Sequence, residues 1–199
     1  ADLASSRLRG NVGIRNASPD KLIGDADCYA QSGNTKTVSA GTLYAIPFRV
    51  EHSGLISGAG AYVATAAASS NIRLGLYRLK LNREPGDLIV ATGDIVTTGT
   101  GPVSGAWATG GARRIPQGDY MLAVKSNGGN PALYATQGSP GAMPQNHWAG
   151  GSGSGTAHKY GMATATDAGS AMPATCPAVS WQGSGVDFAV RLYLLADNL

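Results

Sequence analysis

A chain of 199 residues can bury one hydrophobic core, and 29 glycines with only 14% charged residues favour short strands and turns over helices. The net charge of +3 is dispersed, with Arg113-Arg114 as the only adjacent basic pair, so no concentrated nucleic-acid-binding face is predicted. No run of 18 apolar residues occurs, and no membrane insertion is expected.

Residues 1–40 have weak hydrophobic periodicity and many turn-forming residues. They predict an extended N-terminal arm with one early strand around Val12 to Arg15. The alternative is that this strand is a terminal strand of the main sheet, and the sequence leaves both interpretations open.

From Thr42 to Val50 apolar and other side chains alternate, with Tyr44 and Ile46 on one face, which predicts a half-buried strand. Pro47 has no N–H to donate, so it favours an edge strand or a strand that begins there. The small-residue segment 59–67 fits a strand or a short helix, and its Tyr62-Val63 centre favours the strand.

Residues 72–96 form the best-patterned segment. Ile72, Leu74 and Leu76 alternate on one face, and the next apolar residues then occupy odd positions, which predicts a bulge near Tyr77 or the end of the strand. A turn at Pro85-Gly86 precedes a buried strand that runs to about residue 96.

Further strands are predicted around Tyr120–Val124 and Val186–Leu194, whereas residues 97–111 are typical of a loop. Many short strands without helical periodicity indicate an all-β fold, an antiparallel β-sandwich of jelly-roll type. The sandwich domain is expected over residues 41–199, with a long loop insertion around 127–185.

The chemistry-bearing residues show no catalytic pattern. No zincin, nucleophile-elbow or Walker motif is present, and each acidic residue has a structural or solvated role as its simplest explanation, so no catalytic residue and no enzyme activity are predicted. Cys28 and Cys176 fit either a disulfide or two free thiols. Neither has a histidine at ligand spacing, and no metal site or cofactor is expected.

The long insertion brings aromatic rings together with amide and imidazole groups, a combination suited to sugars because rings pack on C–H faces while polar groups bind hydroxyls. The alternative is that the aromatic residues anchor the loop on the sandwich or pack between subunits. The candidate glycan-binding residues are Tyr134, Asn146, His147, Trp148, His158 and Tyr160.

Four segments follow one another along the chain in a characteristic order. They are LYAIPFRV, AYVATAAASSNIRLGLYRL, EPGDLIVATGDI and IPQGDYMLAVKSNGGNP. In the order of these segments the chain resembles modules of tailed-bacteriophage tail fibres, head fibres and related virion spikes, and the resemblance covers roughly residues 42–130 and the final strand. It implies a non-catalytic jelly roll, often trimeric, which is displayed on a virion and contacts host surface glycans.

We therefore expect a structural virion protein that binds host surface polysaccharide during attachment, with a homotrimer favoured. The N-terminal arm would dock onto other virion proteins. Two alternatives stay open, a ligand-free capsid decoration or tail component, and a secreted carbohydrate-active enzyme or carbohydrate-binding module.

Overall fold

The computed structural model describes residues 8–10, 12–15, 22–23, 35–50, 53–80, 85–137, 163–181, 188–190 and 192–196. Within these ranges every element of regular secondary structure is a β-strand. The described residues contain no helix that is long and apolar enough to cross a membrane. The strands are β1 (Leu8–Gly10), β2 (Val12–Arg15), β3 (Leu22–Ile23), β4 (Thr35–Thr37), β5 (Thr42–Val50), β6 (Gly54–Thr65), β7 (Asn71–Leu79), β8 (Pro85–Ala91), β9 (Ile95–Val96), β10 (Gly101–Ala106), β11 (Arg113–Ile115), β12 (Gly118–Asn127), β13 (Ala132–Gln137), β14 (Ala163–Thr166), β15 (Ser180–Trp181), β16 (Phe188–Val190) and β17 (Leu192–Ala196).

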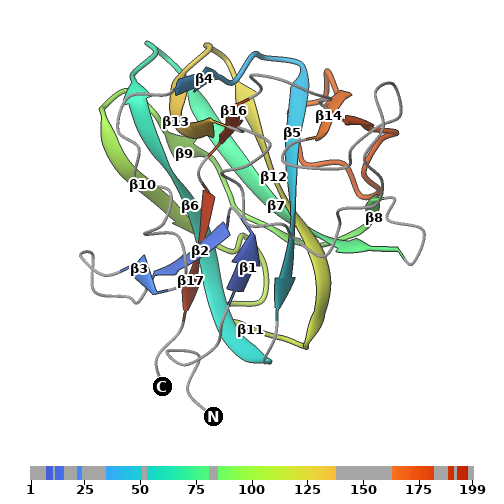
Figure 1. The fold of residues 1–199 in the computed structure, drawn as a ribbon. Helices are drawn as coiled ribbons and strands as arrows, with labels where there is room; N and C mark the ends of the chain where they lie inside the picture. The colour runs from blue at the N-terminus through green and yellow to red at the C-terminus, as the bar shows by residue number, and fades with distance from the viewer. Residues whose placement is uncertain are drawn as a thin grey trace.

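Two sheets pack against each other (Figure 1). Sheet A has the order β15-β14-β5-β12-β7-β8, with β1 paired to β5 and β9 paired to β7. Sheet B has the order β16-β13-β6-β17-β2-β3, with β10 and β11 paired to β6 and β4 paired to β13. Among the described strands only β17 and β2 pair in parallel. The predicted all-β sandwich is confirmed, while the jelly-roll connection stays a prediction.

The main core lies between the sheets and is formed by the inward face of each strand. On β12 this face carries Leu122 and Val124, and on β7 it carries Ile72, Leu74 and Leu76, all fully buried. The predicted alternation is therefore confirmed in these strands. Sheet B contributes small and branched side chains, namely Ala59, Ala61, Val63, Leu133, Leu192 and Leu194.

The outer face of sheet A is also buried. A second apolar cluster contains Leu43, Tyr77 and Met121 from the sheet together with Met172 and Cys176 from the segment that follows β14. We call residues 167–179, which cross this face, the strap. In Figure 1 the chain after β14 is drawn in orange beside β5 and β8.

This second cluster explains the change of apolar phase in β7. The register of β7 with β12 is regular from Asn71 to Arg78, so β7 itself contains no slip. Tyr77 and Leu79 are apolar because the strap covers the face to which they point. The predicted irregularity is present in the pairing with β8, where the register shifts on both sides of Tyr77 and the extra residues belong to β8.

Several strands lie where the sequence predicted loops. β10 lies within residues 97–111, and β13, β14 and β15 lie within 127–185; the last predicted strand is two strands, β16 and β17. The β10 residues GPVSGA alternate in exposure, yet they are small and give almost no contrast in hydropathy. Strands of two to six residues with such side chains carry too little periodic signal to be recognised.

Pro47 lies in the middle of β5, and the expectation of an edge strand or a strand start is wrong. β5 is flanked by β12 along one side, while on its other side β14 pairs as far as Ala45 and β1 pairs from Phe48 onward. Pro47 falls between these two partners, where neither of the described strands β1 and β14 pairs with it, and such a local gap in the pairing tolerates a residue without an N–H.

The N-terminal region contributes strands to both sheets. The early strand predicted around Val12 is confirmed as β2, which pairs with β17, and β1 pairs with β5. These pairings favour the interpretation as sheet strands for the described parts of residues 1–40. A docking role for this region stays a prediction.

Candidate functional site

Of the six residues predicted to bind a glycan, Tyr134 is described. It lies on β13, and its side chain is 36% exposed, one of two exposed large hydrophobic residues in the described part of the chain. The other five, Asn146, His147, Trp148, His158 and Tyr160, lie outside the described residues.

Tyr134 projects from the outer face of sheet B, the face that also carries Tyr62. Leu133 of β13 is paired with Val63 of β6, and both side chains point into the main core. Because successive side chains of a strand point to opposite faces, the next residue of β13 and the preceding residue of β6 both point outward. Tyr134 and Tyr62 therefore belong to one surface.

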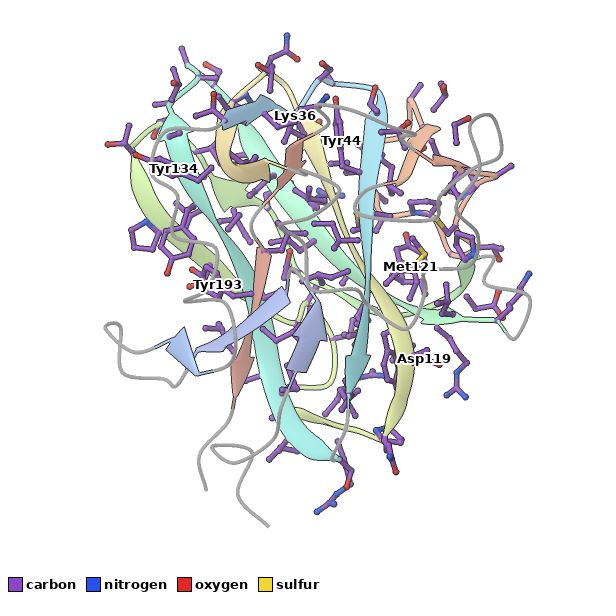
Figure 2. All side chains as sticks on the ribbon, viewed as in Figure 1. Lys36, Tyr44, Asp119, Met121, Tyr134 and Tyr193 are labelled. Carbon is purple, nitrogen blue, oxygen red and sulfur yellow. The ribbon has the colours of Figure 1, made fainter. Side chains whose placement is uncertain are left out.

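Tyr193 of β17 supports this surface from beside Tyr62. Its ring centroid lies 5.4 Å from that of Tyr62 with an interplanar angle of 59°, a tilted geometry favourable for aromatic pairs. Its hydroxyl donates a 2.8 Å hydrogen bond to the Val103 carbonyl, so the ring crosses β6 over Gly60. Figure 2 shows Tyr134 and Tyr193 on the same side of the molecule, away from Met121. We call Tyr62, Tyr134 and Tyr193 the tyrosine cluster.

Polar and ring-bearing residues border the tyrosine cluster. Thr35 of β4 pairs with Tyr134, while on β10 Pro102 pairs with Tyr62 and Ser104 pairs with Gly60. Paired residues share a face, and Thr35, Pro102 and Ser104 are exposed. The face thus combines rings with hydroxyl groups, the chemistry needed to pack on sugar C–H groups and to bind sugar hydroxyls.

Sequence reasoning had not selected Tyr62 or Tyr193 as binding residues. Both occupy strand positions whose neighbours point into the core, and this alternation assigns them to the outward face. The signal that points to them is an aromatic residue on the outward face of a strand, and for Tyr62 that strand is otherwise rich in glycine and alanine.

Two of the described carboxylates, those of Asp94 and Asp87, are hydrogen-bonded to other side chains. Asp94 accepts two hydrogen bonds from the Arg73 guanidinium, at 2.6 and 2.9 Å. This pairing holds the pKa of Asp94 below its ordinary value and raises the pKa of Arg73. Asp87 accepts a hydrogen bond from the Thr175 hydroxyl at 3.0 Å. These contacts fix the positions of both carboxylates.

Lys125 is a buried charged residue on the outer face of sheet A, and only 1% of its surface is exposed. Its ammonium group contacts Asp167 Oδ2 at 2.6 Å and the Ala171 carbonyl at 3.2 Å, and it also donates to the Gly169 carbonyl. With all its N–H groups directed at oxygens, this ammonium acts as a structural cation.

Cys176 is a free, buried cysteine in the strap, whereas Cys28 lies outside the described residues. Burial, with a smaller contribution from the charge of Asp167, raises the pKa of the Cys176 thiol to about 11. The thiol therefore stays protonated at neutral pH. In the described part of the chain, no three His, Cys, Asp or Glu side chains gather to hold a metal ion.

Comparison of the chain with protein-family models, with curated proteins and with solved structures yields no match in any of the three.

Proposed function

We propose that the chain is a structural virion protein, a fibre or spike module whose β-sandwich binds polysaccharide on the host cell surface. The observation that carries the proposal is that Tyr134 and Tyr62 project from the same outer face of sheet B, on the neighbouring strands β13 and β6. The resemblance of four segments to phage appendage modules supports the virion location. The docking of residues 1–40 onto other virion proteins belongs to the same proposal.

The tyrosine cluster suits a sugar for two physical reasons. Tyr62 and Tyr134 project from neighbouring strands of a packed sheet, so little conformational entropy is lost when a ligand binds to them. Tyr193 packs against Tyr62 and is held by its own hydrogen bond to Val103, which keeps the supporting ring in place. A pyranose ring can then pack on the tyrosine rings while hydroxyl groups such as that of Thr35 bind its polar edge.

A binding assay on immobilised bacterial surface polysaccharides tests this proposal. We expect the double variant Tyr62→Ala with Tyr134→Ala to bind about 30-fold more weakly than the wild-type chain, because each lost ring removes about 1 kcal/mol of stacking. The variant Tyr62→Phe with Tyr134→Phe keeps both rings and should retain most of the affinity. Val96→Ala, which changes an exposed side chain on sheet A, is the matched control.

Each outcome of the assay assigns a function. Binding that is unchanged in the alanine variant but lost in Trp148→Ala with Tyr160→Ala would move the contact surface to the long insertion. Release of reducing sugar ends from a polysaccharide would instead identify a carbohydrate-active enzyme. Failure to bind any polysaccharide would favour the ligand-free capsid or tail component.

We also propose that the chain assembles as a homotrimer. One chain has a mass of 20.1 kDa, and sedimentation equilibrium is expected to give three times this mass. A stable monomer over the micromolar concentration range would contradict this part of the proposal without affecting the test of polysaccharide binding.

A further inference from the structure

The strap is fixed to sheet A by backbone hydrogen bonds at both of its ends. Near the interior strand β5 the amide of Asp167 donates to the Gly41 carbonyl at 2.9 Å. At the edge strand β8 the amide of Leu88 donates to the Ala174 carbonyl at 2.8 Å, and the amide of Cys176 donates to the Gly86 carbonyl at 3.2 Å. The strap therefore crosses β5, β12 and β7 and adds a short partner to the edge strand β8.

Between these two ends the strap is held by side chains of two neighbouring strands. Lys125 of β12 and Arg73 of β7 are directly paired and both point outward. The Arg73 guanidinium donates to the Ser170 carbonyl at 2.9 Å, and the Tyr77 hydroxyl donates to the Pro173 carbonyl at 2.9 Å. Lys125 makes the largest number of these bonds and is the most deeply buried charge.

We propose that the strap is a latched cover, which opens without unfolding the sandwich, and that Lys125 is its latch. The geometry favours separate opening because the strap is held by a row of individual side-chain and edge contacts, whereas β7 and β12 are paired along their whole length. Opening exposes Tyr77 and Met121 and leaves the edge of β8 unpaired. A closed strap therefore protects sheet A from pairing with another chain.

Removal of the latch leaves its oxygens without their cation. In Lys125→Met the Asp167 carboxylate and the carbonyls of Gly169 and Ala171 lose the buried ammonium group that they share, and opening of the strap lets water solvate them in its place. Asp167→Asn has the converse effect, because it leaves the Lys125 ammonium buried without an anion.

Alkylation of Cys176 in the native protein reports strap opening, because this thiol belongs to the strap and is buried against sheet A while the strap is closed. We expect iodoacetamide to label Cys176, identified by peptide mass spectrometry, at least about tenfold faster in Lys125→Met than in the wild type. Asp167→Asn should also accelerate labelling. Lys36→Met on β4 of sheet B makes the same chemical change away from the strap and should leave the rate unchanged.

Native-state hydrogen exchange of the wild-type protein keeps the test independent of any variant. The amides of Asp167, Leu88 and Cys176 should exchange through openings that expose less surface. These openings should need less free energy and depend less on urea than the openings through which the β12 amides exchange. Exchange of both sets at one common rate with one urea dependence would show that the strap opens only by global unfolding. That result, or unchanged Cys176 labelling in a folded Lys125→Met protein, would overturn the proposal.

Discussion

Replacing Leu122 by alanine is expected to lower the free energy of unfolding by about 3 kcal/mol. Leu122 is fully buried at the centre of β12, the strand that pairs with both β5 and β7. Its side chain packs into the core between the sheets, where the regular strands around it allow little collapse into the cavity. The cost is therefore a lost hydrophobic contact together with an unfilled cavity.

Urea denaturation followed by circular dichroism measures this change. A lower midpoint with an unchanged dependence on urea would show that stability fell without a change in the unfolded state. Val96→Ala removes an aliphatic side chain that is 60% exposed and should change stability by less than about 0.5 kcal/mol. Equal effects of the two variants would contradict the assignment of the main core.

Replacing Gly60 by alanine is expected to cost about 3 kcal/mol, at the upper end for added core volume. A Cβ atom at this position would overlap the Tyr193 ring and the Val103 carbonyl. Neither neighbour can move freely, because the Tyr193 hydroxyl donates a hydrogen bond to the Val103 carbonyl and this carbonyl belongs to the backbone of β10. The variant should also displace the tyrosine cluster and weaken polysaccharide binding.

Gly93→Ala provides the matched control for Gly60→Ala. A Cβ atom at Gly93 would meet no atom within 4 Å, and the backbone there does not require a positive φ. We expect a change of less than about 0.5 kcal/mol, measured by the same urea titration. A neutral Gly60→Ala variant would show that Tyr193 does not lie across β6 in solution.

The inner faces of the long strands were predictable because they depend on local geometry. In β12 the order Tyr120, Leu122, Val124 places every second side chain toward the core, and the same rule holds for Ile72 and Leu74 in β7. Short strands such as β10 and β14 escaped prediction, since their small side chains give no alternation in hydropathy.

The candidate site was predictable in part. Tyr134 was selected for its place among aromatic and polar residues, and it is the described member of that set. Its neighbours Tyr62 and Tyr193 come from strands more than fifty residues away, and only the pairing of β6 with β13 and β17 brings them together. The separation of residues along the sequence does not reveal which of them strand pairing brings together.

The sequence by itself determined that this protein is an all-β sandwich and that Ile72, Leu74 and Leu76 of β7, with alternate residues of β12, share one face. Only the tertiary structure decided that the opposite face of β7 and β12 is covered by the strap, with Lys125 beneath it, and that Tyr193 of sheet B packs against Gly60 and Val103. The physical reason is that a period of two reports the alternation within one strand. Burial of the second face depends on whichever distant segment packs on it.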